Sequence, residues 1–254
     1  TWMVSWTTSG VLPSGNDEIA YAVSFDFGSS WSPATLLVAG AAFDDRVDWS
    51  SELDVDTSGN LVALVVGYGE LGGHHQYNYA IYISRSDDFG LTWSAPQFLE
   101  FIGVSYLPDS YKVKFATDHE GNWVVFWSGD IDPIGGQAYS SFRTYAVRSS
   151  DDGVTWSRAV RVTSLSYDPT YYEGSNPDLA VDGQGNWVAL WASNIFAAIT
   201  DSPSDVVYVK SSNAGRSWSQ PKVLNANAGD AGDGNESFVT VAASTTGDFV
   251  VTWL

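Results

Sequence analysis

The sequence predicts an all-β fold, because of its composition and of two motifs that recur together along the chain. With 254 residues, 44% of them hydrophobic and only 16% charged, the chain is long and apolar enough to bury a large core. Val, Thr, Tyr, Phe and Trp are abundant, and Gly followed by Asn or Asp recurs between apolar runs. This pattern is typical of short strands joined by tight turns.

The first motif is an octapeptide, Ser-x-Asp/Asn-x-Gly-x-x-Trp, which we call the box. Boxes 1 to 4 are SFDFGSSW (24–31), SDDFGLTW (86–93), SSDDGVTW (149–156) and SSNAGRSW (211–218). Their closing tryptophans lie 62, 63 and 62 residues apart. An alternating apolar run precedes each box and a short one follows it, so each box is predicted to connect the two strands of a hairpin.

The second motif, Asp-x-x-Gly-Asn between two apolar runs, has the same period and starts at Asp56, Asp118 and Asp182, with a variant from Ser244. It predicts a tight turn whose glycine needs a positive φ. Each unit then holds four strands, A to D, with this turn between A and B and the box between C and D. Strand B is apolar on both faces, as in 123–127 and 187–191, which is expected of a sheet between two neighbours.

Four-stranded units repeated radially form a β-propeller, which we favour over a stacked solenoid of sandwiches. The expected units are residues 1–48, 49–110, 111–174, 175–236 and 237–254, in a single propeller domain or a fragment of one. Counting from strand B at residue 2 to strand B at residue 249 gives seventeen strands, about four blades' worth. This number leaves one strand B over and predicts an incomplete ring, with a five-bladed ring with two incomplete blades as second choice.

Composition narrows the range of partners. A net charge of −19 makes nucleic acid and anionic membranes unfavourable partners. The chain has no cysteine, so disulfides and thiolate chemistry are excluded. No apolar run is long enough to span a membrane and no signal peptide is recognisable, so the chain is expected to be a processed or excised piece.

The boxes are predicted to have a structural role. Ser and Asp can accept hydrogen bonds within their own turn, Gly supplies a left-handed conformation, and Trp covers the loop. Asn213 in box 4 keeps the acceptor oxygen without the charge that acid–base or metal chemistry needs. The predicted structural residues are Ser24, Asp26, Gly28, Trp31, Ser86, Asp88, Gly90, Trp93, Ser149, Asp151, Gly153, Trp156, Ser211, Asn213, Gly215 and Trp218. The box tryptophans, together with Trp123, Trp127, Trp187, Trp191 and Trp253, are expected in the core.

The D–A and B–C connections are long and should share the face opposite the turns, which we call the loop face. Long loops on a rigid scaffold commonly carry binding residues. Tyrosines and carboxylates dominate them. The predicted ligand-binding residues are Tyr68, Glu70, His74, His75, Tyr106, Asp130, Asp132, Tyr167 and Tyr171.

The four boxes, with the segment NPDLAVDGQGNWVALW (176–191), resemble the Asp-box or BNR repeats of the sialidase superfamily of propellers, including secreted bacterial sialidase-like proteins. The resemblance covers nearly the whole chain and implies six blades, so the chain is expected to form an incomplete six-bladed ring. For a sialidase-type catalyst it implies an arginine triad, an Arg-Ile-Pro signature, and a tyrosine nucleophile paired with a glutamate. The signature is absent, and Arg46 is the one arginine within the loops, with Arg143 expected near the rim at the start of its strand. The weak catalytic candidates are Tyr172, Glu173, Asp44, Asp45 and Arg46.

Metal binding has two weak candidates. Asp230, Asp233 and Asn235 place oxygen ligands at roughly the spacing of a calcium loop but do not match the EF-hand pattern. His74 and His75 would need a third ligand, such as Glu70, to hold a first-row metal. No cofactor is expected; a plain polar turn is the favoured interpretation of the first segment, and Ca²⁺ is kept as the alternative.

The sequence therefore favours a secreted or cell-surface propeller that recognises glycans or extracellular proteins, or serves as a scaffold, in a longer chain or assembly. The second hypothesis is a glycoside hydrolase of sialidase type with catalytic residues partly outside this chain. A third is an architectural repeat of a larger surface assembly. Fold alone does not decide among them.

Overall fold

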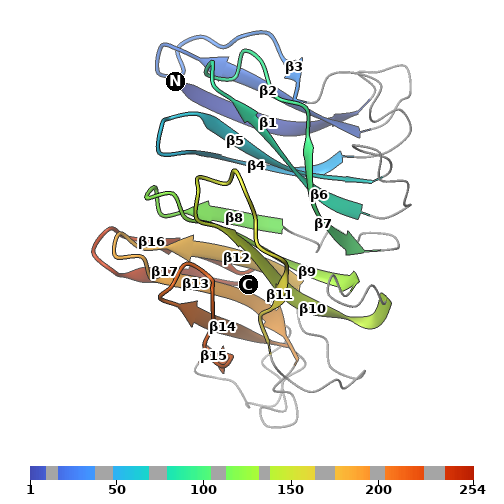
Figure 1. The fold of residues 1–254 in the computed structure, drawn as a ribbon, viewed down its shortest axis with the longest axis vertical. Helices are drawn as coiled ribbons and strands as arrows, with labels where there is room; N and C mark the ends of the chain where they lie inside the picture. Colours follow the sequence, from blue (N-terminus) through green and yellow to red (C-terminus); the bar gives the residue numbers. More distant parts are fainter. Residues whose placement is uncertain are drawn as a thin grey trace. The chain divides into compact units, whose positions relative to one another are not determined.

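The computed structural model describes residues 1–9, 17–37, 48–68, 79–103, 113–131, 138–163, 175–194, 204–225 and 238–254. These residues form seventeen strands and no helix, as the sequence predicts (Figure 1). The chain divides into two compact units, residues 1–105 and 106–254, which are described separately. The boundary lies inside the predicted repeat 49–110, near its end.

Unit 1 contains two antiparallel sheets. The first has the order β1-β2-β3 and the second β4-β5-β6-β7, so that strands adjacent in sequence are paired in space. The strands are β1 (Trp2–Ser9), β2 (Asp17–Ser24), β3 (Thr35–Leu36), β4 (Asp48–Val55), β5 (Leu61–Tyr68), β6 (Tyr79–Ser86) and β7 (Gln97–Gly103).

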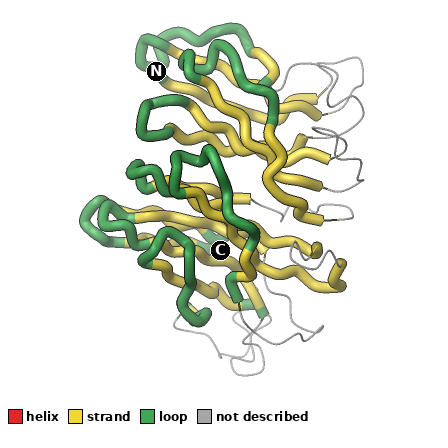
Figure 2. Tube along the Cα trace, viewed as in Figure 1, coloured by secondary structure: helices red, strands yellow, loops and turns green. Residues whose placement is uncertain are grey.

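Unit 2 contains three antiparallel sheets, of order β8-β9-β10-β11, β12-β13-β14-β15 and β16-β17. The strands are β8 (Val113–Thr117), β9 (Trp123–Ile131), β10 (Ala138–Ser149), β11 (Val160–Arg161), β12 (Ser175–Val181), β13 (Trp187–Ser193), β14 (Asp205–Ser211), β15 (Lys222–Val223), β16 (Thr240–Ala243) and β17 (Phe249–Thr252). In each unit the described turns lie at one end of the strands (Figure 2).

The same register recurs in four sheets. The first residue of strand B always faces the serine that opens the box, and the pairs are Trp2 with Ser24, Leu61 with Ser86, Trp123 with Ser149, and Trp187 with Ser211. The two motifs therefore define the same four-stranded unit each time. The predicted fold class, a β-propeller built from four-stranded antiparallel blades, is confirmed.

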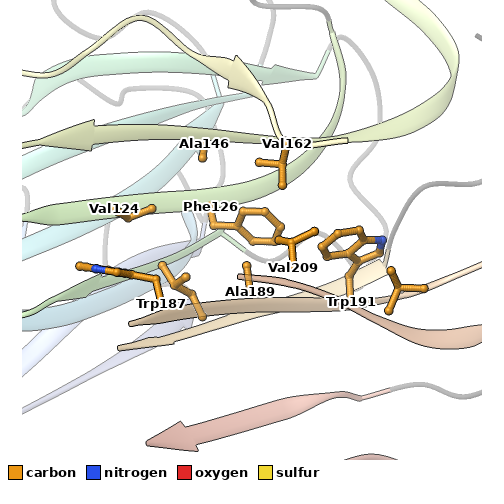
Figure 3. Packing of buried hydrophobic residues seen from close by; sticks show 10 residues of the cluster. Val124, Phe126, Ala146, Val162, Trp187, Ala189, Trp191 and Val209 are labelled. Carbon is orange, nitrogen blue, oxygen red and sulfur yellow. The ribbon is translucent and has the colours of Figure 1, made fainter. Parts of the chain in front are cut away.

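The core of unit 2 lies between its sheets. Trp187 and Trp191 of β13 point toward Val124 and Phe126 of β9, and the Phe126 and Trp191 ring centroids are 5.7 Å apart (Figure 3). All four side chains are fully or almost fully buried. Burying one such side chain stabilises the fold by about 1.5–3 kcal/mol, so this contact is the main force joining neighbouring sheets.

Not every tryptophan at a repeat position lies in the core. Trp31 of box 1 is 41% exposed and Trp253 is also exposed, so their predicted core positions are wrong. The cause is visible in strand β1, where Trp2 and Trp6 are 54% and 40% exposed although their equivalents in β9 and β13 are buried. A strand that is apolar on both faces is buried on both only when a sheet covers each face.

Candidate functional site

The box forms a closed hydrogen-bonding turn. In box 1 the Asp26 carboxylate accepts hydrogen bonds from the Ser30 hydroxyl at 2.6 Å, the Ser30 N–H at 2.8 Å and the Ser24 hydroxyl at 2.8 Å. The Ser24 hydroxyl in turn accepts one from the Gly28 N–H at 2.8 Å. The bonds from Ser30, then that from Ser24, lower the pKa of Asp26 to about 2.

Boxes 2 and 3 repeat this arrangement. Asp88 and Asp151 each accept bonds from the hydroxyl and N–H of a threonine, and from the box serine. The threonine hydroxyl is the largest cause that lowers the pKa of each aspartate to about 2. A carboxyl group with so low a pKa is ionised at neutral pH and is a poor general acid or base. The geometry therefore gives these aspartates a role in holding the turn.

Each box also contains a left-handed residue other than glycine. Phe27, Phe89, Asp152 and Ala214, at the position before the box glycine, have φ between 53° and 63°. In box 1 the Ser29 N–H donates to the Asp26 carbonyl at 3.3 Å across Phe27 and Gly28. Positive φ at both central residues is the sign pattern of a type I′ hairpin turn. The box motif had predicted this conformation for the glycine alone.

The A–B turns are closed by their leading aspartate. Asp182 accepts bonds from the Gln184 N–H, the Asn186 N–H and the Asn186 side-chain amide, each at 2.8 Å. Burial raises the pKa of Asp182, but the bonds from Asn186 and Gln184 outweigh burial and lower it. Asp56 and Asp118 accept the equivalent bonds in their turns.

One contact between sheets was not foreseen from the sequence. Asp178 of β12 accepts hydrogen bonds from the Thr240 hydroxyl at 2.7 Å and the Val241 N–H at 2.8 Å, both in β16. It also accepts a bond from the Leu179 N–H at 3.0 Å. Asp178 and Thr240 are 62 residues apart, one repeat, and this spacing is the signal that would have identified the pair.

The loop face is described only at the ends of its strands. Tyr68 is the last residue of β5 and Asp130 the residue before the last of β9, at the ends opposite the turns. The other predicted loop-face, catalytic and metal-binding residues lie outside the described residues: Asp44, Asp45, Arg46, Glu70, His74, His75, Tyr106, Asp132, Tyr167, Tyr171, Tyr172, Glu173, Asp230, Asp233 and Asn235. Their assignments stay predictions.

The sequence suggested that Arg143 lies at the start of its strand, but the structure places it inside the strand. It is the sixth residue of β10, faces Gly129 across an irregularity in the pairing, and is 1% exposed. The remaining described arginines are Arg85, Arg148, Arg158, Arg161 and Arg216, which lie in or beside boxes or on strand D.

A small cavity lies in unit 2 at the box ends of the strands, and sequence reasoning missed it. Residues 160–162, in and directly after β11, and residues 216–221, at the end of box 4 and after it, line a cavity of about 220 Å³, which we call the rim pocket. Arg161 and Arg216 line it, together with Trp218, whose ring packs on Phe126 with centroids 6.2 Å apart.

Two further kinds of site are missing from the described part of the chain. No group of three or more His, Cys, Asp or Glu side chains is placed to hold a metal ion among these residues. No helix among them is long and apolar enough to cross a membrane.

Several solved structures with a similar fold are glycosidases. The NanB sialidase from Streptococcus pneumoniae is 14% identical with a TM-score of 0.58, over 94% of this chain and 32% of that one. The Penicillium chrysogenum α-L-arabinanase complexed with arabinobiose is 15% identical with a TM-score of 0.61, over 98% and 70%. The Fusarium graminearum GH93 α-L-arabinofuranosidase has the same identity and coverage and a TM-score of 0.59.

At these identities the likeness shows the fold and not the activity. The chain spans about a third of the sialidase and seven tenths of the other two chains. No curated protein sequence matches the chain significantly. A family model described as a BNR repeat-like domain matches residues 14–233. Because this match covers far more than half of the sequence, the protein belongs to the BNR repeat-like domain family.

Proposed function

We propose that the protein is a secreted or cell-surface propeller that recognises glycans through its loop face. The distribution of arginines carries this proposal. Arg143 is buried inside a strand and five others lie at or near the box ends. Arg46 is then the single arginine in the segments that the sequence predicts to be loops. Holding a substrate carboxylate tightly enough for sialidase chemistry takes several convergent guanidinium groups.

The residue types of the loops suit the binding of sugars. Their tyrosines offer flat apolar surface with a hydroxyl group, and their carboxylates and amides accept and donate hydrogen bonds to sugar hydroxyls. In boxes 1 to 3 the aspartate is hydrogen-bonded within its own turn, so these boxes supply a rigid frame and no reactive carboxylate. The fold neighbours that bind arabinobiose or belong to the sialidases support a carbohydrate as the ligand class.

A second function, glycoside hydrolysis, is favoured by one observation: the similar structures described above are sialidases and arabinan-degrading enzymes. Retaining and inverting glycosidases need a pair of carboxyl groups at a defined separation, or a tyrosine with a carboxylate in sialidases. Tyr172 with Glu173, or Asp44 with Asp45, are the residues that such an activity would use.

The test combines binding and turnover on the same protein. We expect glycan-array and calorimetric binding to arabinan or sialylated glycans, without release of 4-methylumbelliferone from the matching glycosides. Turnover that is lost in Glu173→Gln or Tyr172→Phe would contradict a pure recognition role and establish the hydrolase. Asp151→Asn, in box 3, is the matched control, since box 4 carries Asn naturally. Absence of both binding and turnover would reject both functions.

A further inference from the structure

Box 4 differs from the other boxes at two positions that change its charge. The third position is Asp26, Asp88 or Asp151 in boxes 1 to 3 and Asn213 in box 4. The sixth position is Ser29, Leu91 or Val154 in boxes 1 to 3 and Arg216 in box 4. Box 4 therefore lacks a carboxylate and gains a guanidinium group within four residues, next to the rim pocket.

The two segments that line the rim pocket carry only basic charges although the chain is strongly acidic. Residues 153–163 and 206–225 contain no Asp or Glu, but they hold five of the eleven Lys and Arg residues: Arg158, Arg161, Lys210, Arg216 and Lys222. Elsewhere the net charge of −19 repels anions. A local positive potential over a concave site is the arrangement that attracts a small anion.

The substitution of Asn for Asp also changes the hydrogen bonding of the pocket. The Asn213 side-chain oxygen accepts bonds from the Ser217 N–H at 2.9 Å and the Ser211 hydroxyl at 2.9 Å, which fixes the orientation of the amide. Its NH₂ group then donates to the Ser217 hydroxyl oxygen at 2.8 Å. In box 1 the equivalent Ser30 instead donates its hydroxyl hydrogen to Asp26.

The consequence is a hydroxyl donor on the pocket wall. Because Ser217 accepts from Asn213, its own hydrogen is left to donate to a ligand in the rim pocket, which Ser217 lines. Arg161 and Arg216 line the same pocket as this hydroxyl. Such donors suit a carboxylate, since guanidinium groups bind it in a planar, two-point geometry.

The remaining walls suit a sugar ring. Trp218, Pro221, Val160 and Val162 supply apolar surface, and about 220 Å³ is the size of a single small ring and too small for a long oligomer. We propose that the rim pocket binds the carboxylate-bearing sugar of an acidic glycan. It lies at the box ends of the strands, so this second site goes beyond the loop-face function proposed above.

The experiment is an amide NMR titration of the whole chain with sodium glucuronate or N-acetylneuraminate, compared with glucose and sodium sulfate. We expect the acidic sugars to shift the amide signals of Ser217 and Ser219 and the indole signal of Trp218. Glucose should leave these signals in place. Sulfate binding as tight as that of the acidic sugars would overturn the assignment to a sugar, and no shift with any probe would overturn the site.

The sharpest variant is Asn213→Asp, which restores the residue that boxes 1 to 3 contain and should leave the fold intact. The new carboxylate takes the Ser217 hydrogen and opposes Arg216, so we expect about tenfold weaker binding, as for the loss of one charge-assisted hydrogen bond. Arg216→Gln should have a similar effect. Thr245→Asp adds the same charge at an exposed turn and is the control, expected to change affinity less than twofold.

Equal affinity of Asn213→Asp and the parent protein would refute the proposal. The two proposals fail separately, because Glu173→Gln tests the loop face and Asn213→Asp tests the rim pocket. Glycan binding that is lost in the first variant and kept in the second would leave the loop-face function standing and remove this one.

Discussion

Gly183→Ala is the substitution that best tests how two sheets of unit 2 approach each other. A Cβ atom at Gly183, in the β12–β13 turn, would lie 2.6 Å from the Thr245 carbonyl oxygen and 2.9 Å from its Cα, in the β16–β17 turn. These are backbone atoms, so no side-chain rotation relieves the clash. The backbone of Gly183 is not in the left-handed region, so the substitution probes only the close approach.

The expected loss of folding stability in Gly183→Ala follows from these distances. Ordinary contact begins at 3.4 Å, so the β16–β17 turn must move by about 0.8 Å. Overpacking of this kind costs about 1–3 kcal/mol, and alanine recovers about 0.4–1 kcal/mol by restricting the unfolded chain. We expect a net loss of about 1–2 kcal/mol, which lowers the Tm by about 2–8 °C. The bond from the Gln184 amide to the Thr246 carbonyl, now 3.1 Å, should break.

Gly185→Ala, two residues away, is the matched comparison. Its φ is +77° and a Cβ there would meet no atom within 4 Å, so it tests backbone strain without a clash. Hydrogen exchange separates the two: Gly183→Ala should lower protection in β16 and β17, and Gly185→Ala should affect its own turn. If Gly183→Ala stabilises the protein, or leaves β17 protection unchanged, the close approach of the two turns is refuted.

Three further predictions concern single side chains. Phe27→Asn should stabilise unit 1 by about 0.5–1 kcal/mol in urea unfolding, because Phe27 is 84% exposed at a φ of 58° that Asn tolerates better; a loss of stability would show hidden packing. Burial raises the pKa of Glu100, so its contribution to stability is present below its ordinary pKa and lost as pH rises. Glu100→Gln should therefore raise the Tm at pH 7 and have little effect below about pH 4, and a pH-independent change would contradict this cause. The pKa of Asp151, about 2, predicts stability that is present above its ordinary pKa of 3.8 and lost as pH falls through about 2. Asp151→Asn should flatten the fall in Tm over that pH range, and Asp151→Ala should lower the Tm at every pH. Identical curves of Tm against pH for Asp151→Asn and the parent protein would refute this contribution of the Asp151 carboxylate.

The sequence was sufficient for the strands, their order and the register, because each turn needs particular residues at fixed positions. The sequence was not sufficient to predict which side chains are buried, because burial depends on whether a neighbouring sheet covers them. Trp2 and Trp123 occupy the same repeat position, yet Trp2 is exposed and Trp123 is buried. Arg143 was misplaced because the irregular pairing of β10 extends the strand five residues before it.

The two candidate sites, the loop face and the rim pocket, could also be predicted from the sequence only in part. Residues of the loop face could be selected by residue type, but their mutual distances depend on loops that carry no repeat. The rim pocket depends on Arg161 and Arg216, which are 55 positions apart in sequence and meet only when strand D of one sheet lies beside the box of the next. The exchange of Asp for Asn213 was visible in the sequence, but its effect on Ser217 required the hydrogen-bond geometry.

The constant register of the repeats also creates a folding hazard. Sheets with interchangeable backbones can pair with the wrong neighbour, a failure typical of repeat proteins. Core size can prevent this: β5 has Leu61 and Val65 where β9 has Trp123 and Trp127, so a sheet shaped for one strand leaves a void or a clash against the other. The tryptophans that join the sheets thus also help to specify their order.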